Sequence, residues 1–273
     1  MELENETHDH VPALLPRETF DEVASLYDEM RPSYPAQVFD DVISVSGVDS
    51  ASSLLEIGCG TGHATLGLAS RGLCIHCVEL GANMAAVARE KLAAFPLASI
   101  EVADFDHWIR DAKFNLAYSA SAYHWLNAAT REQRIAAMLQ RGGWLAIWRN
   151  RHVRNGSSDE FIDAAQEIYS REAPALVKKR IGLPRPQEVA ETEREQFTSG
   201  LFDELPARLY LWHKAYSAAE YVQMLDTHSD HRLLPEIRRR RLFDGLTNLI
   251  DTKYNGSVTK DYSTLLQMAR KNQ

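Results

Sequence analysis

The sequence contains no long hydrophobic run. Across its 273 residues, no stretch approaches the roughly 18 consecutive apolar residues that a membrane-spanning helix needs. The first ten residues, MELENETHDH, are acidic and lack the basic start and apolar stretch of a signal peptide. We therefore expect a cytoplasmic protein that does not have a membrane as its partner.

Cysteine is also scarce. The chain has three, Cys59, Cys74 and Cys77, which fits a reducing compartment better than a disulfide framework. Cys74 and Cys77 have the spacing of some redox and zinc motifs, but they fall in an expected strand, where residues three apart point to opposite faces. No second cysteine pair exists in the sequence to complete a metal site, so we expect no bound metal.

Positive charge is in deficit, because 30 Lys and Arg against 38 Asp and Glu give a formal net charge of −8. Such a chain is a poor match for nucleic acid, whose binding normally requires a basic face. The remaining composition, 45% hydrophobic and 25% charged, is ordinary for a soluble enzyme. The length favours one main domain with a modest appended region, and leaves open whether the protein is a monomer or a homodimer.

Strand and helix patterns alternate through the middle of the chain. Short apolar runs predict strands at 54–57, 74–79, 100–102, 114–119 and 144–148. Helical patterns lie at 61–70, 82–94 and 130–140. This order is typical of βαβ units, which form a parallel sheet with helices on both faces. Ligands of such sheets bind beyond the carboxyl ends of the strands.

Both ends of the chain depart from this alternation. Residues 1–16 have little periodic pattern, and 17–45 are expected to be helical but broken by RPSYP at 31–35, where two prolines redirect the chain. After residue 150 the sequence becomes polar and partly helical. Later strands are expected at 207–213 and 258–268, and later helices at 217–226 and 234–250.

A glycine-rich sequence, EIGCGTG at residues 56–62, joins the first expected strand to the first helix. Glycines let the backbone turn sharply and let a ligand lie against main-chain atoms, and the helix that follows offers unpaired N–H groups. The dinucleotide fingerprint requires a third glycine one position later than Gly62. Glu79 ends the next strand, where a carboxylate can accept hydrogen bonds from two ribose hydroxyls, although it is also compatible with an exposed strand end.

Segment 54–150 resembles the cofactor-binding half of the class I S-adenosylmethionine (SAM) dependent methyltransferases, in particular the trans-aconitate methyltransferase-like (methyltransferase type 11) group. The matching pieces are the EIGCGTG loop, Glu79 with Asn83-Met84, Asp104-Phe105, FNLAYS at 114–119, Gly142-Gly143, Tyr27 and RPSYP. About 100 residues match well, while the C-terminal third matches only in outline. One departure is Asn115, where the group often has aspartate.

The resemblance implies an α/β fold with a Rossmann-like, seven-stranded, mostly parallel sheet whose last strand runs antiparallel, helices on both faces, and a helical substrate cap. It implies SAM as the cofactor. It assigns Gly58 and Gly60 to the methionine moiety, Glu79 to the ribose, and Asp104 and Phe105 to the adenine. The other expected cofactor contacts are Tyr27, Arg31, Glu56, Gly62, Leu80, Met84 and Ser119.

The same resemblance suggests how the chain is divided. We expect an N-terminal helical segment covering the cofactor site at 1–45 and the SAM-binding core at 46–150. A helical cap insertion is expected at 151–206, and 207–273 should complete the sheet and the cap. Tyr27, Arg31 and Tyr34 either close over the cofactor or form a packing staple.

The candidates for chemistry follow the fourth and fifth strands. In Tyr123-His124-Trp125, His124 is either a base that deprotonates the acceptor or a positioning residue within an aromatic plug. The sequence RNRHVR at 149–154 either attracts an anionic substrate through its guanidinium groups or forms a solvated loop. The expected substrate contacts are Tyr34, Tyr123, His124, Trp125 and Arg149.

The sequence therefore predicts a SAM-dependent methyltransferase acting on a small-molecule methyl acceptor, by O-methylation of a carboxylate or hydroxyl. Two alternatives remain at this level. One is a nicotinamide-dependent oxidoreductase, which the glycine spacing disfavours. The other is a SAM-binding protein that transfers no methyl group.

Overall fold

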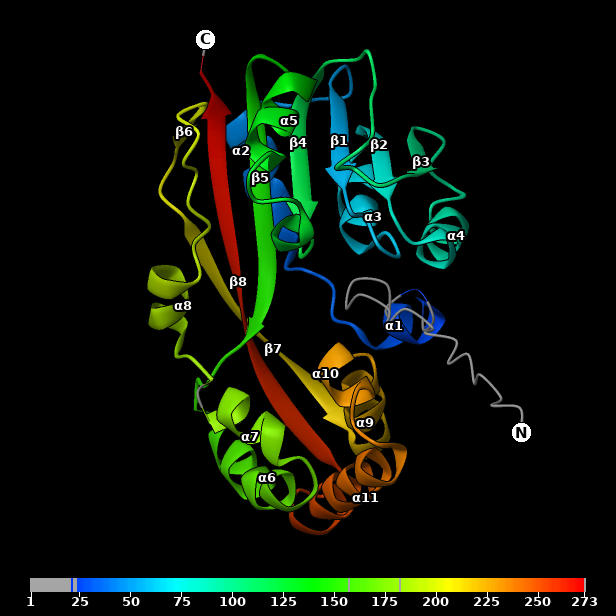
Figure 1. Ribbon diagram of the computed structural model, residues 1–273, viewed down its shortest axis with the longest axis vertical. Coiled ribbons are helices and arrows are strands. Elements are labelled where there is room, and N and C mark those ends of the chain that lie inside the picture. Colours follow the sequence, from blue (N-terminus) through cyan, green and yellow to red (C-terminus); the bar gives the residue numbers. More distant parts are fainter. Residues whose placement is uncertain (1–20, 22–23, 157, 182, 273) are drawn as a thin grey trace, which may run out of the picture.

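The protein consists of an α/β body and a smaller helical body that are joined by long strands (Figure 1). The computed structural model describes residues 21, 24–156, 158–181 and 183–272. The loose segment predicted at 1–16, and part of the helix expected from residue 17, lie outside these residues. Within the described part of the chain, no helix is long and apolar enough to cross a membrane.

The sheet has the order β3-β2-β1-β4-β5-β8-β6, and β7 also pairs with β8. The strands are β1 (Ser53–Ile57), β2 (Cys74–Glu79), β3 (Ala98–Val102), β4 (Phe114–Ala120), β5 (Leu139–His152), β6 (Phe202–Glu204), β7 (Arg208–Ser217) and β8 (Ser257–Lys271). The first five run parallel to one another, and β8 runs antiparallel to β5, β6 and β7. The α/β prediction is confirmed. Among the described strands, β8 alone runs in the opposite direction to the others.

The eight strands exceed the expected seven because the outer strand is split. Strand β6 pairs with the last residues of β8 and β7 pairs with the earlier ones, so both occupy the same edge of the sheet. Pro206 lies between them and has no N–H group to donate to a strand ladder. Leu205 still donates its N–H to the Met268 carbonyl at 2.9 Å, and regular pairing resumes at Arg208.

Helices cover both faces of the sheet because successive strand residues point to opposite sides. Leu54 and Leu116 pack in the core cluster that contains residues of α2 (Ala36–Ser46) and α3 (His63–Ala69). Leu55 and Ala117 pack in a second cluster with residues of α5 (Arg131–Met138). Helix α4 (Ala82–Lys91) lies against β2 and β3.

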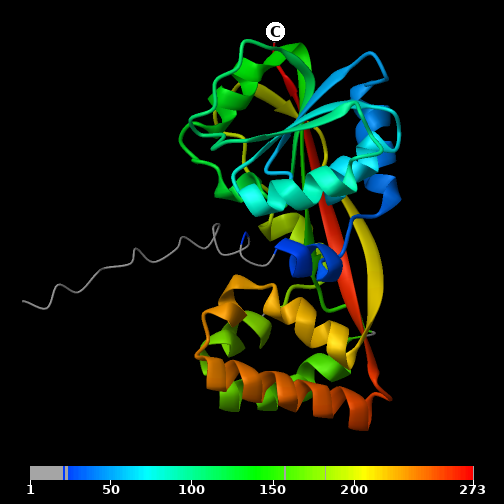
Figure 2. The same ribbon diagram turned by 90° about the vertical axis from the view of Figure 1, so that its right-hand side faces the viewer.

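The helical body has its own core. It contains α6 (Asp159–Glu172), α7 (Pro174–Ile181), α9 (Ala218–Asp226), α10 (Ser229–Arg232) and α11 (Glu236–Lys253). Aromatic side chains fill much of its centre, and Phe161, Tyr169 and Tyr221 are all buried there. Helix α8 (Pro186–Thr192) lies beside β7 and β8. Helix α1 (Ala24–Met30) lies between the two bodies (Figure 2) and contacts α4 and α9.

A carboxyl group is buried inside the α/β core. Glu56 on β1 is fully buried, and its Oε2 accepts hydrogen bonds from the Thr65 hydroxyl at 2.5 Å and the Tyr118 hydroxyl at 2.8 Å. Burial raises the pKa of Glu56 from its ordinary 4.5 to about 7, although these hydrogen bonds oppose the shift. Between about pH 4.5 and pH 7, the folded protein therefore keeps a proton on Glu56 that the unfolded chain has released.

This buried acid predicts a pH-dependent stability. The contribution of Glu56 is complete below pH 4.5 and is lost as the pH rises through 7, because between these values the folded state binds more protons than the unfolded state. Glu56→Gln cannot ionise, so its free energy of unfolding relative to wild type should rise by about 3 kcal/mol between pH 4 and pH 8. Urea denaturation at several pH values measures this difference. The exposed control Glu90→Gln should show no such trend, and a pH-independent Glu56→Gln difference would contradict the prediction.

Candidate active site

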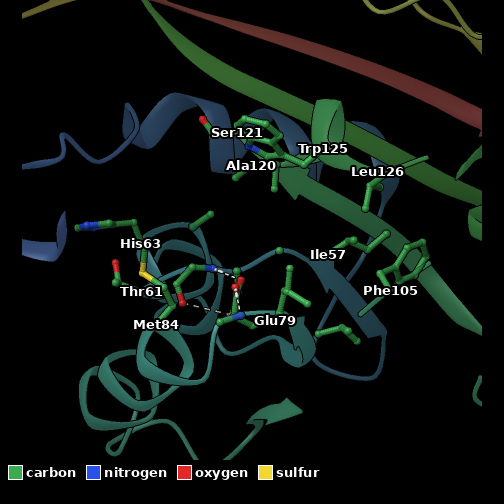
Figure 3. A pocket seen from close by; sticks show the side chains of 18 of the residues that line it. Ile57, Thr61, His63, Glu79, Met84, Phe105, Ala120, Ser121, Trp125 and Leu126 are labelled. Atoms are coloured by element: carbon green, nitrogen blue, oxygen red, sulfur yellow. Dashed lines mark hydrogen bonds between the residues drawn. The ribbon is translucent and has the colours of Figure 1, made fainter. Parts of the chain in front are cut away.

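A cavity of about 350 Å³ lies at the carboxyl ends of β1, β2, β4 and β5, between the sheet and α1. Figure 3 shows this cavity with Glu79 on one wall, Thr61, His63 and Met84 to one side of it, and Ile57 and Phe105 to the other. Ser121 and Trp125 lie on the opposite wall. The position agrees with the general rule for ligand sites in parallel sheets.

The glycine loop forms the floor of the cavity. Gly58 and Gly60 have φ values of 71° and 56°, in the left-handed region that favours glycine. A Cβ on Gly58 would lie 2.5 Å from the Cβ of Ala122, whereas a Cβ on Gly60 would meet no atom within 4 Å. Gly58 is thus needed for packing, and Gly60 leaves backbone exposed to the space where a ligand would lie.

Glu79 holds this loop in place. Its carboxylate accepts hydrogen bonds from the N–H groups of Gly60 at 2.7 Å and Gly81 at 2.8 Å (dashed lines in Figure 3). Burial raises the pKa of Glu79, while these backbone hydrogen bonds lower it. A carboxylate has about four acceptor positions, and the backbone donors of Gly60, Gly81 and Leu80 do not use all of them. The side chain lines the cavity, which suits a pair of hydroxyl donors.

The structure brings most of the predicted cofactor contacts to this cavity. The residues that line it are Tyr27, Arg31, Gly58, Gly60, Glu79, Leu80, Met84, Asp104 and Phe105. Phe105 is buried at 5% exposure against Trp108, so its ring is fixed before any ligand arrives. Asp104 accepts a hydrogen bond from the Asp106 N–H at 3.0 Å.

Three predicted cofactor residues do not line the cavity. Glu56 points into the core, as described above. Strand side chains alternate between the two faces of a sheet, and that of Glu56 lies on the face covered by α3, where it bonds to Thr65. Ser119 donates its hydroxyl to the Ile57 carbonyl at 2.8 Å, and Gly62 is the N-cap of α3. Ser119 thus holds the end of β1 that leads into the glycine loop, and Gly62 joins the loop to α3.

The predicted substrate residues divide in the same way. Tyr34, His124, Trp125 and Arg149 line the cavity, whereas Tyr123 is turned away from it. The Tyr123 ring lies under the Arg131 guanidinium, with 4.1 Å between the guanidinium carbon and the ring centroid. Tyr34 donates a hydrogen bond to Ser121 at 3.0 Å, and burial raises its pKa.

His124 lies in the short 3₁₀ helix η2 (Tyr123–Trp125) that follows β4. Burial lowers its pKa, and the positive charge of Arg149 lowers it further. The imidazole is therefore neutral at pH 7 and has a nitrogen free of a proton, which is the form that a base requires.

Arginines on β5 face the same end of the cavity. Arg149 and Arg151 are two residues apart, so they lie on one face of the strand, and both line the cavity. Each forms an ion pair with Glu193, at 2.7 Å and 2.6 Å. Arg154 is bound to Asp163 at 2.6 Å, outside the cavity.

The N-terminal segment is anchored to both bodies. Arg31 donates hydrogen bonds to the side chain and the carbonyl of Thr227, at 2.9 and 3.1 Å, and its guanidinium lies 5.1 Å from the Tyr27 ring centroid. Asp21 accepts hydrogen bonds from the N–H groups of Asn83 at 2.8 Å and Met84 at 2.9 Å, at the start of α4.

Sequence reasoning missed several residues that line the cavity. Thr61 and His63 belong to the glycine loop and the first turn of α3, so their position in the loop could have identified them. Arg151, which is part of the sequence RNRHVR considered above as a whole, also lines the cavity. Asp21 had no sequence signal, because it meets α4 only through the tertiary fold. Among the described residues, no cluster of three His, Cys, Asp or Glu could hold a metal ion.

Comparison with known proteins agrees with this geometry. Residues 54–143 match the family described as "Methyltransferase domain". An uncharacterized methyltransferase of Mycobacterium tuberculosis is 29% identical over 67% of this chain and 71% of its own length. A trans-aconitate 2-methyltransferase of Rhodopseudomonas palustris is 25% identical over 66% of this chain and 67% of its own. A malonyl-[acyl-carrier protein] O-methyltransferase of Geobacter sulfurreducens is 34% identical over 42% of this chain and 45% of its own.

The fold is also similar to that of solved methyltransferase structures. A putative type II methyltransferase from Anaeromyxobacter dehalogenans has a TM-score of 0.60 and 20% identity, over 88% of this chain and 97% of that one. This likeness supports a Rossmann-like fold over the part of the chain that it covers. Residues 54–143 therefore match a methyltransferase domain, and the chain is similar in sequence to methyltransferases and shares the fold of the class I enzymes.

Proposed function

We propose that this protein is a methyltransferase that uses SAM as its methyl donor and methylates an oxygen of a small molecule. The observation that supports it best is the pairing of an open glycine backbone at Gly60 with the Glu79 carboxylate, whose acceptor positions are not all used, in one cavity. When bound, SAM supplies a sulfonium methyl group that a nucleophile displaces directly. Glycine spacing and the methyltransferase relatives both disfavour a nicotinamide cofactor.

The residues present fit this cofactor. Glu79 would accept the ribose hydroxyls, the loop at Gly58 and Gly60 would contact the methionine part, and Asp104 with Phe105 would hold the adenine. Leu80 and Met84 would add apolar contact beside the ribose and adenine, and Tyr27 on α1 and Arg31 just after it would cover the cofactor. The end of the cavity near β5 would remain for the methyl acceptor.

The acceptor end of the cavity is defined by Tyr34, His124, Arg149 and Arg151. The helical body lies beside it, and we propose that α6 to α11, within the segments 151–206 and 207–273, form the substrate cap. Methyl transfer depends on holding the nucleophile in line with the methyl group. A carboxylate is already anionic and needs no base, whereas a hydroxyl requires a proton acceptor, which His124 would provide.

A carboxylate acceptor suits the local charge. Arg149 and Arg151 together carry one more positive charge than Glu193 neutralises, and guanidinium groups bind carboxylates in a bidentate manner. Two relatives are named for trans-aconitate and for malonyl-[acyl-carrier protein] as acceptors. Both names denote acids, which agrees with the charge of the site.

Calorimetric titration with SAM and S-adenosylhomocysteine tests the cofactor. Wild type should bind both, and Glu79→Ala should weaken binding about tenfold to a hundredfold, because hydrogen bonds to a charged group are lost. Glu90→Ala on the exposed side of α4 is the control and should bind like wild type. Circular dichroism checks folding. Failure of folded wild type to bind either ligand would overturn the proposal.

The arginine contribution is tested by Arg149→Gln. This change should raise the KM for a carboxylate acceptor about tenfold and leave the Kd for S-adenosylhomocysteine within about twofold, because the guanidinium faces the acceptor end. Arg154→Gln is the matched control, since Arg154 belongs to the same basic sequence but pairs with Asp163 outside the cavity. Equal, small effects of Arg149→Gln on both constants would contradict this assignment.

The role of His124 is tested with a carboxylic acid and a phenol of the same skeleton. For the phenol, kcat should rise with pH through the lowered pKa of His124 and level off near neutrality. His124→Gln should abolish that rise and reduce kcat about a hundredfold or more, while changing the rate with the acid little. An equal loss with both acceptors would identify a positioning residue instead.

A further inference from the structure

One carboxylate, Glu193, serves both cavity-lining arginines of β5. Its Oε2 lies 2.7 Å from Arg149 Nη2, and its Oε1 lies 2.6 Å from Arg151 Nη2. Its side chain is 13% exposed, and it does not line the main cavity. It contacts a small adjoining cavity that also touches Arg149 and His124. Glu193 therefore lies behind the guanidinium groups, as seen from the acceptor.

The backbone around Glu193 is fixed. Its N–H donates to the Val189 carbonyl at 3.0 Å, at the end of α8, and Arg149 also donates to the Glu193 carbonyl at 2.8 Å. Two residues later, the N–H of Glu195 donates to Gln267 on β8 at 2.8 Å. Glu193 is consequently a fixed counter-ion, and not a side chain on a loose loop.

The charges around this end of the cavity can be counted. Arg149 and Arg151 contribute two positive charges and Glu193 one negative charge, which leaves a net charge of +1. His124 is neutral at pH 7 for the reason given above.

The other charged groups nearby are engaged elsewhere. Glu195 is paired with Arg131 at 2.8 Å. Arg31, the residue after α1, lines the cavity, is bound to Thr227 at the end of α9, and belongs to the part assigned to the cofactor.

We propose that Glu193 is a specificity-determining residue, which sets the acceptor end to receive one carboxylate group and disfavours a second. This inference rests on the proposed function, because it takes the arginine end of the cavity as the acceptor site. Glu193 acts through the two arginines: it orients their guanidinium groups and removes one of their charges. A second carboxylate on the acceptor would find no unpaired cation and would lose hydration without compensation.

Charge-changing variants separate this role from a structural one. Glu193→Gln raises the local net charge from +1 to +2, and Arg151→Gln lowers it to 0. The double variant Glu193→Gln/Arg151→Gln restores +1 although it has lost both members of one ion pair. Glu191→Gln, an exposed residue of α8, removes one negative charge without touching either arginine and serves as the control.

The experiment titrates hexanoate and adipate, which share a chain and differ by one carboxylate, into each variant saturated with S-adenosylhomocysteine. Wild type and Glu191→Gln should bind hexanoate more tightly than adipate. Glu193→Gln should shift the ratio of the two Kd values toward adipate by about tenfold, and Arg151→Gln should weaken hexanoate by about tenfold. The double variant should return to the wild-type ratio.

Two kinds of failure remain distinguishable. Absence of S-adenosylhomocysteine binding by wild type would refute the proposed cofactor, and the acid titrations are then repeated on the protein alone. The inference about Glu193 is overturned if wild type binds neither acid, if Glu193→Gln leaves the ratio unchanged, or if the double variant behaves like Glu193→Gln. A general loss of structure would weaken both acids equally, so it would not produce the expected change of ratio.

Discussion

The antiparallel pairing of β5 with β8 determines how the rest of the protein is arranged. It runs from Trp144 opposite Arg270 to His152 opposite Tyr262, well beyond the edge of the parallel strands. At a rise of roughly 3.3 Å per residue, strands of this length reach from the α/β body into the helical body (Figure 1). Backbone hydrogen bonds therefore fix the position of the helical body over the cavity, and the same ladder places Arg149 and Arg151 at its acceptor end.

Within that arrangement, the cavity is divided by charge. Asp21, Glu79, Asp104 and Asp106 line the part near β2 and β3, while the arginines line the part near β5. The acidic residues are positioned by hydrogen bonds to backbone N–H groups, as Glu79 and Asp21 show. Such preorganisation lets both ends meet their ligands without rearranging the loops. One cavity thus has two chemically distinct ends, as the proposed methyl transfer between two ligands would require.

Local sequence predicted the elements whose pattern does not depend on partners. The strands β1, β2 and β4 are short apolar runs, and the glycine loop between β1 and α3 was identified together with Glu79. Strand β5 is longer than expected at both ends. Its polar C-terminal part, which includes Arg151, is extended because it pairs with β8, and its first residue Leu139 pairs with Phe114 of β4. The three-residue strand β6 was missed for the same reason.

The site was predictable to a similar degree. Residues adjacent to strand ends, such as Glu79, Asp104 and His124, were found because the carboxyl ends of parallel strands converge. Glu56 was placed wrongly with respect to the cavity, since sequence position does not reveal which way a buried strand residue points. Nothing in the sequence identified Glu193 as part of the site, because it follows α8 and is 44 residues away from Arg149 in the chain.

The split of the outer strand at Pro206 has a consequence for the protein in solution. A sheet edge with a long row of free N–H and C=O groups can recruit strands from other molecules and so seed aggregation. Here the edge is divided between a three-residue piece and β7, and the junction has a proline that cannot donate. Arg208 and Lys214 add positive charge along β7. The edge formed by β6 and β7 is therefore a poor template for intermolecular strand pairing.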